Sequence, residues 1–478
     1  MDKRKQQREE FLNHMLSEVH KIPVAEVVGS VVDLVPSGRY LKGLCPFHAD
    51  HHLGSFIVTP DKNLWRCFAE GIGGSPVTFV MEYNHIGYLQ AAFKLAYEYG
   101  IISDEEYRKY SGKKWDKETV KEIRKTFEEP EKAQGIRADD DVIYAVYNAM
   151  PHVCPLSEAH LKHLRKERML PQSALDDYFT VPTRHMNVAG KVILYIAEQI
   201  SERKFGKKLK ALNEDEKEYI EKIMARVIEQ IRYVPGFFYN KNTQKIDFAS
   251  YKGIGFLIRD HKGHAVGIQI RRDVVKEGES RYVFFSSAFA QSLPYAEGGA
   301  SSGNPGGFIA SKKDGKARLC ITEGRFKAEK IAAEGNNAVY VSGVSSWKSV
   351  MKMVTEVTHP GECVYLMFDA DAFGNTAVYK QLSALNNELE QNGLKTRLIF
   401  WAKENGKGFD DLVINKGSRY ASYLKMMSFQ EFSASYNEVF SEVMKKFQIQ
   451  EIRDLPGDRR EEFSKTLQHE MEVKLKLK

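Results

Sequence analysis

The sequence predicts a multidomain α+β and α/β protein that begins with a small zinc-ribbon-like domain. A Cys-x-x-His pair, Cys45 and His48, is followed after a strand-like run by Cys67, which is how small zinc modules present their ligands. Over residues 317–412, apolar β runs alternate with helical patterns, which indicates a mainly parallel sheet with helices on both faces. Amphipathic helical patterns from about residue 417 onward predict a helical C-terminal tail.

The spacing of the zinc-type residues also predicts the local fold that joins them. Residues 55–67 read SFIVTPDKNLWRC, which is two β-rich runs around the turn signal PDKN. This pattern predicts a hairpin that returns Cys67 to the first pair of ligands. Thiolate and imidazole groups suit a tetrahedral zinc site, so Zn²⁺ is the expected metal.

The run GRYLKGLCPFH…SFIVTPDKNLWRCF…GIGGSPVTFVMEY resembles the N-terminal zinc-binding domain of bacterial DnaG-type primases, over roughly residues 22–102. That family orders its four zinc ligands as Cys, His, Cys and Cys. The first three positions are taken here by Cys45, His48 and Cys67. Glu70 takes the fourth, and His51 or His52 is the alternative if the loop folds back. A second alternative is a domain that keeps its fold without metal.

The composition is that of a globular protein with several domains. The chain has 478 residues, of which 42% are hydrophobic and 28% charged, so it can form more than one core. No apolar run approaches the roughly 18 residues of a membrane span. The charged N-terminus lacks the apolar core of a signal peptide. Five cysteines form no disulfide framework, which fits the cytoplasm. The net charge of +6 permits a polyanionic partner without requiring one.

Short β runs in the middle of the chain carry several basic residues. The stretch 255–287 is similar to the basic N-terminal half of the DnaG-type polymerase core. Arg271 falls on the strand arginine of that family, and Arg281 takes the place of a lysine. Independently of the resemblance, Lys252, Arg271, Arg272 and Arg281 lie on neighbouring β runs and are expected to line one groove. Phosphate contacts there would position a nucleic-acid strand without reading its sequence.

Acidic residues follow three of the apolar β runs in the α/β region. Glu323 follows the first run, and Asp369 and Asp371 follow the run VYLMF. Asp410, with Asp411, comes after the run LIFWA. Because ligands in parallel sheets bind at the carboxyl ends of strands, these acids are expected at one edge. Clustered carboxylates need a cation to neutralise them, and hard oxygen ligands suit Mg²⁺ or Mn²⁺.

The order of these acids resembles the Toprim domain shared by DnaG-type primases, topoisomerases and some nucleases. The resemblance implies that Glu323, Asp369 and Asp371 are catalytic and that they bind magnesium together with Asp410. Two departures are visible. Primases commonly have an aspartate where this chain has Lys327, which would instead pair with a phosphate. Their later element has two acids flanking a proline, of which Gly408-Phe409-Asp410 keeps only the second.

The predicted organisation has five segments. They are a primase-type zinc-binding domain (1–104), a charged helical linker (105–140), a basic α+β subdomain (141–310), a Toprim domain (311–416) and a helical C-terminal region (417–478). Near the start of the third segment, a helix that begins after Ser157 carries basic residues at 162–168. A solvated helix face and DNA binding both remain open for them.

Together these features predict a DNA primase that makes short RNA primers on single-stranded DNA from ribonucleoside triphosphates. With no Gly-x-x-x-x-Gly-Lys-Ser/Thr motif in the sequence, a replicative helicase is expected to act in trans. The departures favour a divergent member from a phage, plasmid or integrated element. The alternatives are a Toprim-type nuclease and a DNA-binding replication factor with a decayed catalytic site.

Overall fold

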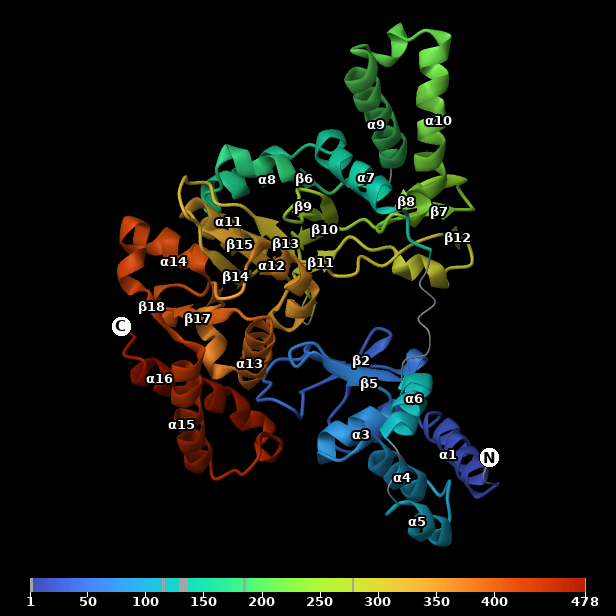
Figure 1. The fold of residues 1–478 in the computed structure, drawn as a ribbon, viewed down its shortest axis with the longest axis vertical. Helices are drawn as coiled ribbons and strands as arrows, with labels where there is room; N and C mark the ends of the chain where they lie inside the picture. Colours follow the sequence, from blue (N-terminus) through green and yellow to red (C-terminus); the bar gives the residue numbers. More distant parts are fainter. Residues whose placement is uncertain are drawn as a thin grey trace. The chain divides into compact units, whose positions relative to one another are not determined.

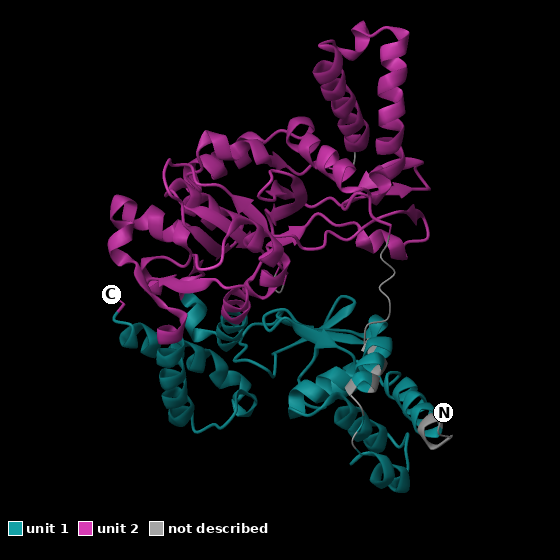
Figure 2. Ribbon diagram, in the orientation of Figure 1, with its two compact units in different colours: residues 1–132, 371–384, 433–476 teal, residues 133–370, 385–432, 477–478 magenta. Residues whose placement is uncertain are grey.

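A computed structural model describes residues 3–113, 115, 117–128, 136–183, 186–276 and 279–477, and it separates into two compact units (Figures 1 and 2). Unit 1 comprises residues 1–132, 371–384 and 433–476, and unit 2 comprises residues 133–370, 385–432 and 477–478. Residues 129–135 of the predicted linker lie outside the described residues. The predicted five-segment division stays a prediction.

Unit 1 contains a five-stranded antiparallel sheet in the order β1-β2-β3-β4-β5. Its strands are β1 (Val35–Ser37), β2 (Tyr40–Gly43), β3 (Phe56–Thr59), β4 (Leu64–Cys67) and β5 (Ile72–Gly74). The predicted hairpin is β3–β4, and its turn closes on Asn63 in the left-handed region (φ 53°). The side chain of Asn63 donates to the carbonyls of His20 and Ile22, which ties the turn to the preceding helices.

Helices make up most of the rest of unit 1. They are α1 (Lys3–Val19), α2 (Val24–Gly29), α3 (Pro76–Asn84), α4 (Tyr88–Glu98), α5 (Asp104–Tyr110), α6 (Lys117–Glu128), most of α15 (Phe429–Phe447) and α16 (Arg460–Lys474). The rings of Phe56, Trp65 and Phe79 pack 5.4–6.2 Å apart, centroid to centroid. The Trp65 indole donates to the carbonyl of Ser75, so its only polar group is satisfied within the core. The zinc-ribbon-like N-terminal domain and the helical C-terminal end are therefore confirmed.

Unit 2 begins with helices and two small sheets. The helices are α7 (Asp140–Val153), α8 (Glu158–Lys162), α9 (Val188–Phe205) and α10 (Glu214–Gln230). One sheet runs β11-β10-β9-β6 and the other β12-β7-β8. Their strands are β6 (Tyr178–Thr180), β7 (Phe237–Asn240), β8 (Lys245–Phe248), β9 (Gly253–Arg259), β10 (Ala265–Arg272), β11 (Tyr282–Phe284) and β12 (Ala296–Glu297). The antiparallel pair β9–β10 lies at the centre of the four-stranded sheet, with β11 and β6 at its edges. Helices α9 and α10 form a hairpin (Figure 1).

A six-stranded, mainly parallel sheet completes unit 2 in the order β13-β15-β14-β16-β17-β18. Its strands are β13 (Gly307–Ile309), β14 (Leu319–Glu323), β15 (Asn337–Val341), β16 (Cys363–Met367), β17 (Lys395–Phe400) and β18 (Lys425–Ser428). The intervening helices are α11 (Arg325–Ala333), α12 (Met351–Val357), α13 (Thr376–Gln391), whose residues 376–384 belong to unit 1, and α14 (Phe409–Lys416). The four inner strands are parallel and the two edge strands antiparallel.

The order of the strands fixes where a site should form. After β14 the chain moves to β15 on one side, and after β15 it crosses back to β16 on the other side. The strand order therefore reverses between β14 and β16, and ligands in such sheets bind at the carboxyl ends beside this reversal. Glu323 is the last residue of β14, and Asp369 follows β16 by two residues. Within the described part of the chain, no helix is both long and apolar enough to cross a membrane.

Candidate functional site

Cys45, His48 and Cys67 form a buried cluster in unit 1. Cys45 and His48 lie in the loop between β2 and β3, and Cys67 is the last residue of β4. One potential ligand atom from each lies within 4.8 Å of the other two, and the three residues are 0–3% exposed. The hairpin has therefore brought the third ligand, the sulfur of Cys67, to the first pair, as the sequence predicts.

The electrostatics of the cluster favour a metal-binding thiolate. Backbone amides donate to both sulfurs, from Phe47 to Cys45 at 3.5 Å and from Glu70 to Cys67 at 3.3 Å. A hydrogen bond from Cys45, aided by His48, lowers the pKa of Cys67 to about 5 against the opposing effect of burial. Burial raises the pKa of Cys45. Two buried sulfurs and one imidazole, with one thiol already acidic, fit Zn²⁺.

Glu70 is buried beside the cluster, but its carboxylate pairs with a lysine. Its Oε1 lies 3.1 Å from Nζ of Lys380 on α13, and the same Nζ donates to the carbonyl of Phe47. Burial raises the pKa of Glu70, while the charge of Lys380 opposes that rise. The rings of His51 and His52 lie 4.2 Å apart. Among the described residues, the close three-ligand cluster includes none of these side chains, and the fourth ligand stays a prediction.

If Glu70 completes the zinc site, Glu70→Cys should tighten zinc at least about tenfold, because a thiolate is a softer and more basic ligand than a carboxylate. The measurement is competition for zinc with a chromogenic chelator. Lys380→Met is a second test of the same idea. It keeps Glu70 but removes its ion-pair partner, so it should also tighten zinc. Unchanged affinity in Glu70→Ala, with loss in His51→Ala or His52→Ala, would assign the fourth position to a histidine.

In unit 2, acids from the strand ends gather around one pocket of about 210 Å³. Four carboxylates and four basic side chains line it: Glu323, Asp369, Asp410, Asp411, Arg168, Arg325, Lys327 and Lys407. The expected gathering of acids after β14, β16 and β17 is therefore observed for Glu323, Asp369 and Asp410. Asp371 falls in unit 1, and its part in the site stays a prediction.

Local backbone geometry explains how two acids reach the pocket. Gly324 has φ 79°, a left-handed conformation that lets the chain turn from β14 directly into α11. Glu323 is thereby left at the end of the strand. Asp410 lies in the first turn of α14, and burial together with repulsion from Asp411 raises its pKa. Arg168 opposes that rise, because its Nη1 donates to Oδ2 of Asp410 at 3.2 Å.

Lys327 is the basic residue most closely engaged with these acids. Its Nζ lies 2.6 Å from Oδ1 of Asp369, and its side chain is 17% exposed. Lys407 lies 4.0 Å from Oδ2 of the same aspartate and is 62% exposed. Burial lowers the pKa of Lys327, but the charges of Asp369 and Glu323 outweigh burial and raise it. Lys327 is therefore a fixed ammonium within the acidic pocket.

A buried arginine holds the helix that carries Lys327. Arg325, in the first turn of α11, donates from Nη1 to the carbonyl of Leu257 on β9. Its Nη2 lies 2.8 Å from Asp177 and 3.0 Å from Glu329. These contacts hold the start of α11 against the sheet that contains β9, and they thereby fix the position of Lys327.

Sequence reasoning did not single out Arg168 as a pocket residue. Arg168 is the last residue of the basic stretch 162–168. Helical spacing alone does not show whether the basic side chains of this stretch lie on a solvated face or on a binding face. The structure breaks that spacing, because residues His163–Glu167 form a π-helical turn. An extra residue per turn shifts the side chains that follow, so the one that reaches Asp410 is not predictable from a regular helix.

The four basic residues predicted to line one groove lie close together but on different faces of their sheet. Arg271 is opposite Tyr282 across β10–β11, and the amide of Arg272 donates to the carbonyl of Arg281. Opposed residues in antiparallel strands share a face, while neighbours along a strand alternate. Arg271 therefore shares the face of Tyr282, which lines the acidic pocket, whereas Arg272 and Arg281 lie on the other face. Lys252 stands immediately before β9.

Because Arg271 and Arg272 lie on opposite faces, their substitutions are expected to affect DNA binding differently. Arg271→Ala should weaken binding of single-stranded DNA and lower the salt slope by roughly one unit, the loss of one phosphate contact. Arg272→Ala is the matched control on the opposite face, where the side chain already pairs with Glu279 at 2.5 Å. Fluorescence anisotropy at several salt concentrations measures both variants. Equal slopes for wild type and Arg271→Ala would show that the strand does not contact Arg271.

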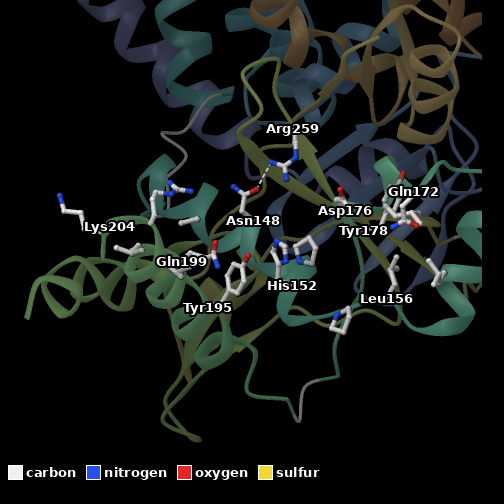
Figure 3. Close-up of a pocket in the computed structure, with 18 of the residues that line it drawn as sticks. Asn148, His152, Leu156, Gln172, Asp176, Tyr178, Tyr195, Gln199, Lys204 and Arg259 are labelled. Atoms are coloured by element: carbon white, nitrogen blue, oxygen red, sulfur yellow. Dashed lines mark hydrogen bonds between the residues drawn. The ribbon is translucent and has the colours of Figure 1, made fainter. Parts of the chain in front are cut away.

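A larger cavity of about 1050 Å³ lies elsewhere in unit 2, between α7, α8 and α9 (Figure 3). Tyr195 of α9 stacks on His152 of α7 with ring centroids 4.8 Å apart. Arg259 points to the opposite part of the cavity, where it donates to Asn148 at 2.9 Å and to Asp177 at 2.8 Å. No feature of the sequence predicted this cavity, because its walls come from four separate segments.

Comparison with known proteins gives two family matches. Residues 8–111 match the DnaG-type zinc ribbon, described as a CHC2 zinc finger. Residues 311–420 match a domain of unknown function (DUF3854). The first match confirms that the N-terminal domain is a DnaG-type zinc ribbon and supports zinc binding by the three-residue cluster. The second covers the four inner strands of the six-stranded sheet, from β14 to β17, and its acids without assigning an activity, so the Toprim interpretation stays a prediction.

The similar proteins are primases, but the similarity is local. A DNA primase of Geobacillus stearothermophilus is 39% identical over 80 residues, and one of Aquifex aeolicus is 37% identical over 86 residues. These segments cover 17% and 18% of this chain, but only 13% and 17% of the two relatives. A crystal structure of the Aquifex aeolicus primase (zinc binding and RNA polymerase domains) has a TM-score of 0.40 and 17% identity, over 97% of this chain and 99% of that one. The confirmed resemblance to DnaG-type primases therefore rests on the zinc ribbon.

Proposed function

We propose that this chain is a DNA primase that joins ribonucleotides into short primers on a single-stranded DNA template. One observation carries the proposal. A zinc ribbon similar to those of DNA primases occurs in the same chain as carboxylates at the strand reversal of a mainly parallel sheet. The first feature gives the class of protein, and the second gives a place where phosphoryl transfer can be catalysed.

In the proposed mechanism, Glu323, Asp369, Asp371 and Asp410 would hold Mg²⁺ or Mn²⁺. The bound metal would activate a 3′-hydroxyl and stabilise charge on the phosphates. Arg168 and Lys407 line the same pocket and carry positive charge that suits triphosphate oxygens. Arg271, on the face of Tyr282, would position the template through its phosphates. The carboxylate set supports this assignment, because oxygen ligands on neighbouring loops leave room for water and phosphate.

The proposal extends to domains and partners. Segment 1–104 would dock the template or a partner protein, segment 141–310 would hold the strand, and segment 311–416 would carry out catalysis as a Toprim domain. Ribonucleoside triphosphates would be the substrates, and a separate replicative helicase would unwind the duplex. The cytoplasm is the proposed location, which five free cysteines support. A phage, plasmid or integrated element is the proposed origin.

One assay tests this function against its alternatives. Purified full-length protein is incubated with single-stranded DNA, labelled ribonucleotides and Mg²⁺ or Mn²⁺. A primase yields short RNA that requires both template and metal. A Toprim-type nuclease degrades the DNA, and a decayed replication factor binds it without either product. The ion pair between Lys327 and Asp369 is the observation that favours the decayed alternative, because an ammonium occupies space among the proposed metal ligands.

A further inference from the structure

Lys327 and Gly408 are the two departures from the primase pattern, and they meet in the acidic pocket. We propose that Lys327 is a built-in counter-ion that takes the place of one divalent cation in this pocket, and that Gly408 provides the space that admits it. The inference rests on the proposed function for the presence of metal at the remaining acids. The inference explains both departures from the primase pattern, Lys327 and Gly408, by one local arrangement.

The fit between the two residues is steric. A Cβ added to Gly408 would lie 2.6 Å from Cε and 3.4 Å from Cδ of Lys327. It would also lie 2.5 Å from Oδ1 of Asp410. The backbone of Gly408 has φ −98° and ψ 166°, which any residue adopts. Space rather than backbone conformation therefore favours glycine here, and the side chains of Lys327 and Asp410 occupy that space.

The charge arrangement supports the role of a counter-ion. The Lys327 ammonium contacts Asp369 at 2.6 Å and is also attracted by Glu323 and Asp410. With as many basic as acidic side chains, the lining is balanced before any metal binds. Among the described residues, only the zinc-ribbon cluster brings three potential ligand atoms within 4.8 Å of one another. The described pocket acids do not form such a cluster, and the Lys327 ammonium contacts one of them, Asp369.

The position of Lys327 is fixed, which distinguishes a counter-ion from a mobile surface lysine. Arg325, two residues earlier, is 5% exposed and anchors the first turn of α11 through Asp177 and Glu329. Lys407 approaches the same Asp369 from a largely exposed position at 4.0 Å. A half-buried ammonium with a short contact neutralises a carboxylate more effectively than an exposed one, because water screens the latter. The same substitution at the two lysines therefore separates the two roles.

The first experiment counts Mn²⁺ ions on zinc-loaded full-length protein by electron paramagnetic resonance. Lys327→Asp should bind one more Mn²⁺ per chain than wild type, because it removes the ammonium and supplies a carboxylate. Lys407→Asp makes the same change in charge near the same Asp369, and its count should equal that of wild type. Equal counts for wild type and Lys327→Asp, including no binding by either, would overturn the proposal.

The second experiment tests the steric pairing without divalent metal other than zinc. Gly408→Ala should lower the melting temperature of the protein by about 5 °C in the wild-type background, because the added methyl group collides with the lysine stem. In the Lys327→Ala background, Gly408→Ala should lower the melting temperature by less than half as much. The remaining decrease would come from the contact of the added methyl group with Asp410. A Gly408→Ala cost that is the same in both backgrounds would contradict the assigned use of the space.

These measurements separate the inference from the function on which it rests. Primer synthesis by wild-type protein is assayed in parallel with the Mn²⁺ counts. If Lys327→Asp binds an extra ion but wild type makes no primers with any metal, the counter-ion role of Lys327 is supported and the primase function is rejected. If wild type makes primers but both proteins bind the same number of ions, the primase function is supported and the counter-ion role is rejected.

Discussion

Cys67→Ser is expected to abolish zinc retention and to lower the melting temperature of the zinc ribbon by more than about 10 °C, since metal binding to a structural site is largely folding free energy. Cys67 lies at the end of β4, whereas Cys45 and His48 lie in the loop between β2 and β3. A shared zinc ion would connect these two segments, so loss of Cys67 would remove the connection. The sulfur is buried and its pKa is lowered to about 5, chiefly by a hydrogen bond from Cys45, which suits it to bind zinc as a thiolate.

The measurement is zinc content by atomic absorption together with calorimetric melting of the full chain. Cys154→Ser is the matched control, because Cys154 is also buried but lies in unit 2. It reports the cost of a buried hydroxyl with zinc content unchanged. A Cys67→Ser protein that lacks zinc yet melts like the control would show that the aromatic core around Trp65 holds the domain without metal.

The features that could be predicted from sequence are those set by short-range patterns. The β3–β4 hairpin follows from two β-rich runs around one turn, so the approach of Cys67 to Cys45 is local information. The gathering of Glu323, Asp369 and Asp410 follows from the rule that parallel strands present their carboxyl ends together. Both predictions needed only the identity of the elements and their order along the chain.

The features that could not be predicted depend on contacts between distant segments. Glu70 pairs with Lys380, which is 310 positions away, and no spacing rule connects the two. The sequence identifies Lys327 as a departure from a pattern, but its contact with Asp369 depends on how α11 packs.

The basic strand residues are an intermediate case. The alternation of side chains along a strand would have separated Arg271 from Arg272, but the pairing of Arg281 with Arg272 depends on the register of β10 and β11. Register is set by the buried face of the sheet and by the connection between strands, which a single sequence specifies weakly. The register places Arg271 and Arg272 on opposite faces of the sheet, and one groove shared by all four basic residues stays a prediction.

Glu323→Gln is expected to reduce primer synthesis by at least about 10²-fold, because it removes one proposed metal-binding charge at the strand reversal. The amide has nearly the shape of the carboxylate, so single-strand binding should stay close to that of wild type. Asp369→Asn should have a comparable effect on synthesis. The measurement is primer yield at saturating Mg²⁺ together with anisotropy of labelled single-stranded DNA.

The two variants differ in their expected effect on stability, and that difference tests the structure of the pocket. Asp369 is the ion-pair partner of the poorly exposed Lys327, so its replacement leaves an ammonium with weakened compensation. Removal of one member of a buried pair costs about 3 kcal/mol in the free energy of unfolding. Glu323→Gln removes a charge that attracts Lys327 but also repels the other pocket carboxylates, and it should cost less than Asp369→Asn. Denaturant unfolding measures both costs. Full primer synthesis in either variant would remove that residue from the catalytic set, and equal stabilities would contradict the Lys327–Asp369 pair.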